Sequence, residues 1–278
     1  MSAQSSLAGR TVLMSGGSRG IGLAIAVRLA GEGANIAFIA KTDTPHPRVA
    51  GTVHTAAAEI EAAGGRALPI LGDIRDDDTV SKAVTETAGH FGGIDIVINN
   101  ASAISLSGIG ELPLKRYDLM QDVNARGTFA LMSAAMPYLG ESVAPRVLTL
   151  SPPLSLDRRW LVEHAPYTVS KYAMTMLTLG VAEQYREQGF AACCLWPRTL
   201  IATAAVQNVV AGDEGMRSSR RPEIMADAAA LVLGLDPSQS NGQCFVDEDV
   251  LRAQGVTDLS RYLYEGATEE NLAPDLLL

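Results

Sequence analysis

Ser15-Gly16-Gly17-Ser18-Arg19-Gly20-Ile21-Gly22 is the stretch that decides the fold, because it joins a short apolar run, 11–14, to a helical pattern near 20–31. Glycines at such a junction permit a tight turn and let a pyrophosphate approach backbone N–H groups, while the helix start favours the anion. A purely structural turn is the alternative. The predicted strand and helix on either side favour a dinucleotide-binding loop.

Outward from this loop, short β-branched or apolar runs alternate with longer, alanine-rich amphipathic segments. This alternation is typical of strand–helix–strand units and a parallel sheet. We therefore expect an α/β fold, with a single Rossmann-type doubly wound parallel sheet of about seven strands and helices on both faces. The expected strands are 11–14, 35–40, 66–71, 95–99, 146–150, 190–195 and 243–246, and the expected helices lie near 20–31, 53–63, 76–91, 114–140, 167–188 and 223–234.

Composition excludes several classes of protein. The chain has 278 residues, a net charge of −9 and 47% hydrophobic residues, so it is too apolar to be disordered. Without a basic field, nucleic acid and anionic membranes are not expected partners. The longest apolar runs, 127–140 and 199–212, are too short to span a bilayer, and residues 1–6 do not resemble a secretory signal. Three cysteines build no disulfide framework, so we predict a cytoplasmic protein.

The chain shows no interdomain linker, which predicts a single domain over residues 1–278 with a tail from about 251. This tail ends in Leu276-Leu277-Leu278, and such an apolar end needs burial. Packing on its own domain is the favoured interpretation, and an intersubunit contact is the alternative. The basic cluster Arg217, Arg220 and Arg221 is interpreted as solvated loop charge, with an anionic substrate as the other reading.

The end of the second predicted strand indicates which dinucleotide is bound. An NAD site needs an acidic residue there to accept hydrogen bonds from the ribose hydroxyls. This sequence has Ala40-Lys41-Thr42 instead, and Asp43 lies past the expected position. Lys41 and Arg19 are suited to a 2′-phosphate, so we predict NADP(H) in preference to NAD(H). The alternative is that both side chains are solvated.

A second motif, Tyr167-Thr168-Val169-Ser170-Lys171, opens a predicted helix. Residues four apart share one helix face, so the phenol and the ammonium converge. A neighbouring lysine cation favours the phenolate, which predicts a lowered pKa for Tyr167. Tyr167 then exchanges a proton with a carbonyl or alcohol oxygen while hydride moves to or from the cofactor.

With both motifs present, the chain resembles the short-chain dehydrogenase/reductase family over nearly its whole length. Gly72-Asp73-Ile74 resembles the family's adenine site, and Asn99-Asn100-Ala101-Ser102 resembles the Asn-Asn-Ala-Gly that shapes the cofactor pocket. Val123-Asn124-Ala125-Arg126-Gly127 resembles the segment whose asparagine kinks a helix and supports a proton relay. The resemblance implies that Asn124, Tyr167 and Lys171 are catalytic, and that the protein is a homodimer or homotetramer.

The family's catalytic serine is missing from its usual place. Its two expected positions are Leu154 and Pro152, within Ser151-Pro152-Pro153-Leu154-Ser155. Ser151 and Ser155 are the candidate replacements; Thr149, a backbone group or no replacement remain open. Loss of such a donor weakens polarisation of the substrate oxygen.

Trp196-Pro197-Arg198-Thr199 stands where the family has Pro-Gly, so Arg198 is expected to add a charge beside the nicotinamide. Pro197, Ile201 and Thr203 resemble the segment that binds the carboxamide and diphosphate. These departures resemble the reductase part of the hydroxysteroid dehydrogenase-like protein 2 group, without its sterol-carrier domain. The cofactor-binding residues so predicted are Ser15, Gly16, Ser18, Arg19, Gly20, Ile21, Gly22, Lys41, Asp73, Ile74, Asn100, Ala101, Ser102, Tyr167, Lys171, Pro197, Ile201 and Thr203.

The sequence thus predicts an NADP(H)-dependent oxidoreductase that interconverts a carbonyl and an alcohol, with no metal. Apolar residues in loops 101–113 and 197–222 favour a lipid-like substrate. The missing serine motivates a second hypothesis, a catalytically weakened NADP(H)-binding sensor or scaffold. The apolar loop residues are Leu106, Ile109, Leu112, Leu200, Val206, Val209, Val210 and Met216.

Overall fold

A computed structural model describes residues 7–45 and 50–278, and it contains one sheet of seven parallel strands. The strand order is β3-β2-β1-β4-β5-β6-β7, so the sheet grows from β1 in both directions. This order confirms the predicted Rossmann-type doubly wound fold. The strands are β1 (Thr11–Ser15), β2 (Asn35–Ala40), β3 (Arg66–Leu71), β4 (Ile96–Asn99), β5 (Arg146–Thr149), β6 (Ala191–Trp196) and β7 (Cys244–Val246).

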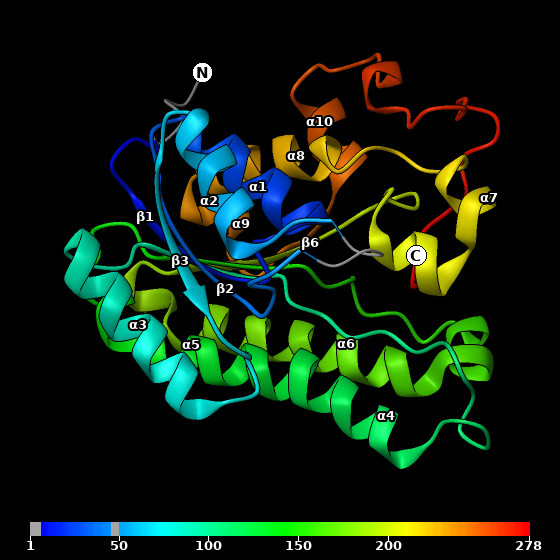
Figure 1. Cartoon of the computed structure of the whole chain (residues 1–278), viewed down its shortest axis with the longest axis horizontal. Helices are drawn as coiled ribbons and strands as arrows, with labels where there is room; N and C mark the ends of the chain where they lie inside the picture. The colour runs from blue at the N-terminus through cyan, green and yellow to red at the C-terminus, as the bar shows by residue number, and fades with distance from the viewer. Residues whose placement is uncertain (1–6, 46–49) are drawn as a thin grey trace.

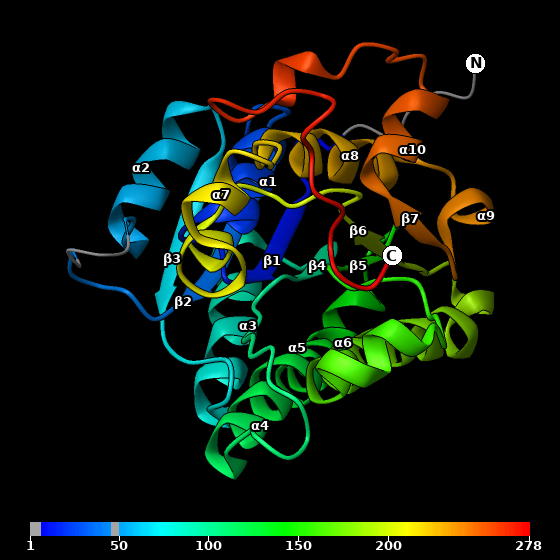
Figure 2. The same ribbon diagram turned by 90° about the vertical axis from the view of Figure 1, so that its right-hand side faces the viewer.

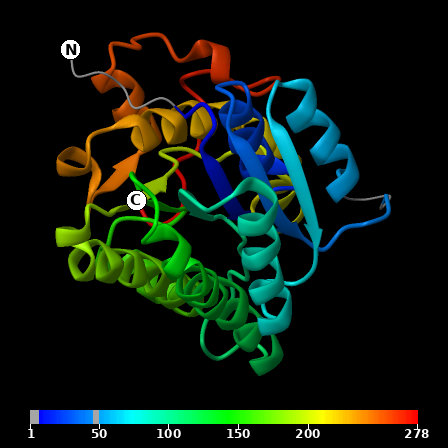
Figure 3. The same ribbon diagram turned by 90° about the vertical axis from the view of Figure 1, so that its left-hand side faces the viewer.

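Helices cover both faces of the sheet, and Figures 1 and 3 show the strands enclosed between two helical layers. One layer contains α1 (Gly20–Ala30), α2 (Val53–Ala62), α8 (Glu223–Gly234), α9 (Pro237–Ser240) and α10 (Asp247–Ala253). The other contains α3 (Asp77–Phe91), α4 (Leu114–Met120), α5 (Gly127–Leu139) and α6 (Arg158–Gln184). A short helix, α7 (Gly212–Met216), follows β6.

The core forms two halves, one on each side of the sheet. Alternate residues of a strand point to opposite faces, so Met14 and Phe38 pack toward α1 and α8 whereas Leu13 and Val97 pack toward α3 and α5. Strands buried on both faces need apolar side chains at every position. This is why the inner strands stand out in the sequence as nearly continuous apolar runs, whereas β3, at the edge of the sheet, is partly exposed.

Two helical regions differ from prediction. The expected helix 114–140 is interrupted by a π-helical turn, Gln121–Arg126, which contains the predicted kink at Asn124. Helix α6 begins at Arg158, nine residues before the predicted start, because the side chain of Asp157 caps it by accepting from Arg159 N. Its backbone breaks at His164, with φ −134° and ψ 26°, and Pro166 supplies no N–H, so the sequence shows only the second half clearly.

The C-terminal segment packs on the body of its own chain. Residue 251 lies inside α10 rather than at the start of a tail. Farther on, Leu277 is fully buried beside Met120 and Tyr167. In Figure 2 this last segment, in red, runs down in front of the strands. The chain itself therefore buries the apolar end that the sequence predicted would need cover.

The basic cluster is not wholly solvated, which corrects the prediction. One of its members, Arg220, is buried and binds the part of the chain that leads to the C-terminus. Arg220 is 1% exposed, and its guanidinium contacts Glu248 at 2.8 Å and Glu269 at 2.8 Å. It also donates to Leu259 O at 3.2 Å. Arg217 and Arg221 are exposed, as expected. The error arose because the two glutamates lie 28 and 49 residues farther along the chain.

Among the residues that the structure describes, no helix has both the length and the apolar character that a membrane span requires.

Candidate active site

The glycine loop and the segment after β4 form one hydrogen-bonded unit. Ser15 is buried, and its hydroxyl oxygen accepts from the backbone N–H groups of Asn100 at 3.2 Å and Ala101 at 3.1 Å. The Asn100 side chain donates to Gly16 O at 2.7 Å. The carboxyl ends of β1 and β4 are neighbours in the sheet, because Ser15 pairs with Asn99. These contacts bring two of the predicted motifs to the same edge of the sheet.

The loop has the backbone geometry of an anion site. Gly16 has φ +77°, which disfavours a side chain, and a Cβ on Gly22 would lie 2.2 Å from Gly16 O. Arg19 stands at the start of α1 and makes no side-chain capping hydrogen bond there, so the helix start is left open to a ligand. The loop therefore fits a phosphate group bound by backbone N–H groups.

Two predicted cations lie near the end of β2, each with protein partners. Arg19 donates to Thr42 Oγ1 at 2.6 Å and to Gly51 O at 2.9 Å. Lys41 Nζ lies 3.4 Å from Asp73 Oδ2, and its side chain is 60% exposed. Arg75 also binds Asp73 at 2.7 Å, which lowers the pKa of this carboxyl to about 2. Asp73 is therefore ionised at neutral pH, and its carboxylate would compete with a cofactor phosphate for Lys41.

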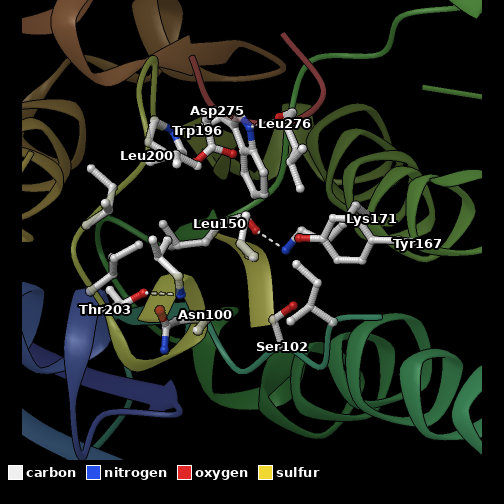
Figure 4. Close-up of a pocket in the computed structure, with 17 residues that line it drawn as sticks. Asn100, Ser102, Leu150, Tyr167, Lys171, Trp196, Leu200, Thr203, Asp275 and Leu276 are labelled. Carbon is white, nitrogen blue, oxygen red and sulfur yellow. Dashed lines mark hydrogen bonds between the residues drawn. The ribbon is translucent and has the colours of Figure 1, made fainter. Parts of the chain in front are cut away.

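Tyr167 and Lys171 converge on one cavity of about 160 Å³, as the helical spacing predicts (Figure 4). Lys171 donates to Leu150 O at 2.6 Å, and its ammonium lies 4.9 Å from the centre of the Trp196 ring. The whole cavity is lined by Ile21, Asn100, Ser102, Ile104, Leu150, Tyr167, Lys171, Trp196, Pro197, Leu200, Ile201, Thr203, Ala205, Val206, Val210, Asp275 and Leu276.

Burial has the largest effect on the pKa of both Tyr167 and Lys171. It raises the pKa of Tyr167 above its ordinary value, Asp275 adds to this, and a hydrogen bond with Ser102 opposes it. Burial also lowers the pKa of Lys171 to about 7. The predicted lowering of the Tyr167 pKa is therefore not found, because burial, which disfavours the phenolate, has the largest effect on this group.

Asn124 lies in the π-helical turn, is fully buried and does not line the cavity. Its side chain accepts from Ala103 N at 2.7 Å and donates to Ala103 O at 2.9 Å. It also donates to Ser170 Oγ at 2.9 Å, one residue before Lys171. Asn124 therefore links the segment after β4 to the helix that carries the tyrosine and the lysine.

Comparison with known protein families shows which family shares the glycine loop and the Tyr167–Lys171 pair. The short chain dehydrogenase family model matches residues 10–214, which contain the glycine loop, Asn124, Tyr167 and Lys171. The chain belongs to this family. The family's fold implies that a nicotinamide cofactor is bound.

Full-length relatives extend the match beyond the family model. Hydroxysteroid dehydrogenase-like protein 2 of Danio rerio is 46% identical over 272 residues, and that of Homo sapiens is 45% identical over 273. Each alignment covers 98% of this chain and 64% of the relative, so this chain matches their reductase-like part and spans less than two thirds of their length.

Solved structures support the same assignment. A short chain dehydrogenase from Mycobacterium thermoresistibile is 53% identical, has a TM-score of 0.91, and is matched over 98% of this chain and 96% of its own. A solved structure from Xanthomonas campestris is 48% identical, with a TM-score of 0.93 and 99% of each chain covered.

The candidates for the missing family serine do not line the cavity. Ser151 is fully buried beside Cys194, and Ser155 Oγ accepts from Asp157 N at 3.2 Å. Thr149 is buried in a network with Asn99 at 3.1 Å and Thr178 at 2.7 Å. A serine that does line the cavity together with Tyr167 is Ser102, which stands where the family pattern has glycine.

The other predicted cofactor residues divide into two groups. Ile21, Pro197, Ile201 and Thr203 line the cavity. Ser18 and Ile74 are buried but do not line it. A Cβ on Gly20 would lie 3.3 Å from Thr203 Cγ2, so the first loop lies close to the segment after β6.

Arg198 does not add a charge to the cavity, which corrects the prediction. Its side chain pairs with the exposed Asp249, and its backbone N–H donates to Asp247 Oδ1 at 2.9 Å. The residue is directed away because Asp247 and Asp249, at the start of α10, lie beside it.

Two residues of the C-terminal segment, Asp275 and Leu276, line the cavity and were not predicted. Asp275 N donates to Arg198 O at 3.0 Å, and Trp196 Nε1 donates to Leu276 O at 2.8 Å. The only signal in the sequence was the terminal leucine run, which predicts burial but not its place.

Proposed function

We propose that this protein is an NADP(H)-dependent oxidoreductase that interconverts a carbonyl and an alcohol on an apolar or lipid-like substrate, with Tyr167 as general acid and base. The observation that carries the proposal is the convergence of Tyr167 and Lys171 on a cavity that Ile21 and Asn100 also line. The proton-transfer pair thus lies next to the anion-binding loop.

The residues that would hold the cofactor are the loop 15–22, Asn100 and the segment 197–203, with Arg19 and Lys41 toward the 2′-phosphate. When bound, the nicotinamide supplies or accepts the hydride. Lys171 would donate to a ribose hydroxyl, because within residues 7–45 and 50–278 its ammonium has only a carbonyl and a thioether as hydrogen-bond partners.

Tyr167 would give its proton to the carbonyl oxygen in reduction and take it back in oxidation. A phenolate formed there is a buried anion, and protonated Lys171 stabilises it because the two side chains face the same cavity. Asn124 would hold the surrounding backbone in place through Ala103.

The lining of the cavity supports an apolar substrate. Ile104, Leu200, Val206, Val210 and Leu276 face it. Polar contacts near Tyr167 fix orientation, while apolar side chains supply most of the contact area, as is typical of small-molecule sites. Among the other apolar loop residues, Ile109 and Val209 are exposed, and Leu106 and Leu112 pack around Tyr167.

We further propose that residues 1–278 act as one domain in a cytoplasmic homodimer or homotetramer. Helices α5 and α6 leave Phe129, Val169 and Met176 more than half exposed. Exposed apolar side chains on neighbouring helices favour association between copies.

The decisive experiment compares Tyr167→Phe with the wild type on a panel of lipid-like ketones and aldehydes, with NADPH oxidation measured. We expect kcat/KM to fall by about 10² to 10⁴-fold while the Kd for NADPH changes by less than about threefold. Tyr117→Phe, on the exposed face of α4, is the matched control and should keep full activity. Unchanged turnover by Tyr167→Phe would contradict the proposal. NADPH binding with no turnover by the wild type would favour the sensor or scaffold.

A further inference from the structure

The reaction proposed above needs a hydroxyl donor near the reacting oxygen, and Ser102 is the serine that meets the requirement. Its side chain lines the cavity and is exposed to it. Tyr167 lines the same cavity, and its interaction with Ser102 lowers the pKa of the phenol against the larger effect of burial. In Figure 4 the hydroxyls of Ser102 and Tyr167 and the ammonium of Lys171 face the same space.

The backbone on both sides of Ser102 is fixed. On one side, Ser15 Oγ accepts from the N–H groups of Asn100 and Ala101. On the other side, both backbone groups of Ala103 are bound by Asn124, at 2.7 and 2.9 Å. The backbone of Ser102 is thus held in place, so only rotation about its side-chain bonds remains to aim the hydroxyl.

We propose that Ser102 performs the task of the missing family serine from the segment after β4, by donating its one hydroxyl hydrogen to the substrate oxygen before proton transfer and to the Tyr167 oxygen after it. This inference rests on the proposed function. Ser102 reaches the site from the end of β4, whereas the family's serine follows β5. It is a positioning residue toward Tyr167, and it exchanges no proton of its own.

In the direction of reduction, the carbonyl carbon gains a hydride, which a bound reduced nicotinamide would supply and which would leave that ring oxidised. The carbonyl oxygen gains the proton of Tyr167, and the C=O π bond is replaced by C–H and O–H bonds. The phenolate left on Tyr167 then accepts a hydrogen bond from Ser102. Because Ser102 stabilises that anion, it opposes the effect of burial and of Asp275, which both raise the pKa of Tyr167.

The test uses three variants of Ser102. Ser102→Ala and Ser102→Gly remove the hydroxyl, and Ser102→Thr keeps it. We expect kcat/KM to fall about 10- to 100-fold in the first two, mostly through kcat, and Ser102→Thr to recover at least half of the wild-type value. In alcohol oxidation, the rise of activity with pH should move to higher pH by about half a unit or more in Ser102→Ala. A merely structural role would not move this pH profile.

The controls separate the two proposals. Ser81→Ala, an exposed serine on α3, should match the wild type. If Tyr167→Phe is inactive while Ser102→Ala stays within twofold of the wild type at every pH, Ser102 has no such role and the proposed function survives. If Ser151→Ala or Ser155→Ala causes the predicted loss and shift instead, the role belongs to that serine. If Tyr167→Phe remains active, the proposed function itself fails.

Discussion

Asn124 binds both backbone groups of Ala103, accepting from its N–H at 2.7 Å and donating to its C=O at 2.9 Å. The segment after β4 has no sheet partner at this point, so the amide takes the place that a neighbouring strand would otherwise occupy. A side chain in a helix thereby extends the order of the sheet into the active site.

Removing this amide should affect both stability and catalysis. In Asn124→Ala, two partly buried backbone groups lose their partners, so we expect the free energy of unfolding to fall by about 2 to 4 kcal/mol in urea denaturation. The kcat should fall more than the KM rises, because Ser102 and Lys171 both lie beside residues that Asn124 binds. Asn208→Ala, which removes an exposed local hydrogen bond, is the control and should cost less than about 0.5 kcal/mol. Equal losses in the two variants would contradict the role of Asn124.

Cofactor preference should depend on Lys41. A cation beside a 2′-phosphate strengthens binding of NADP(H) and contributes nothing comparable to NAD(H). We expect Lys41→Ala to weaken NADPH binding by about 10-fold and to leave the Kd for NADH within about twofold, by titration calorimetry. Lys82→Ala, an exposed lysine paired with Glu86 on α3, should change neither. An equal loss of affinity for both cofactors would show that Lys41 does not bind the 2′-phosphate.

Arg220 should be essential for the stability of the C-terminal segment. Arg220→Met leaves the buried Glu248 without its main partner, which should cost about 3 to 5 kcal/mol. The double variant Arg220→Met with Glu248→Leu removes both charges and should recover part of the loss. Arg217→Met, an exposed neighbour, should remain within about 0.5 kcal/mol of the wild type in the same denaturation experiment. A mild effect of the single Arg220 variant would rule out a buried ionic anchor.

Stability should fall as pH rises from about 4 to about 7, and Asp247 should cause part of that fall. Burial raises the pKa of Asp247 to about 7 from an ordinary value of 3.8. The folded protein therefore keeps a proton that the unfolded chain has lost in this window, and the associated stabilisation disappears as pH passes about 7.

Asp247→Asn tests this pH dependence, since the amide keeps an acceptor for Arg198 N and Glu248 N but does not titrate. The free energy of unfolding, measured by denaturation between pH 4 and 8, should decline less steeply in the variant, by up to about 4 kcal/mol across the window. Asp249→Asn, with a largely exposed side chain, should retain the wild-type slope. Identical slopes for Asp247→Asn and the wild type would mean that another group titrates.

The strands of the sheet could be predicted from the sequence because the residue patterns that indicate a strand are local. Each predicted strand boundary lies within one residue of the observed one, since most of the strands are buried on both faces and are largely apolar. The glycine loop, Tyr167 and Lys171 were likewise predictable, because turn geometry and helical spacing place neighbours in sequence close together in space.

Contacts between distant parts of the chain could not be predicted from the sequence. Leu276 meets Trp196 across 80 residues, and Arg220 meets Glu269 across 49, so neither pairing leaves a local pattern. The contact of Ser102 with Tyr167 was missed for the same reason. A serine after a strand indicates a turn or a pocket, and only the fold shows which side chain it faces.

The C-terminal residues that line the cavity, Asp275 and Leu276, are attached to the end of β6 and the segment after it through their own backbone atoms. Ala273 O accepts from Leu200 N at 3.0 Å, Asp275 N donates to Arg198 O, and Leu276 O accepts from the Trp196 ring. Side chains at these positions can therefore be exchanged while the attachment stays intact. Substitutions at a few residues far from the sheet therefore change the lining of the cavity while Tyr167 and Lys171 keep their places.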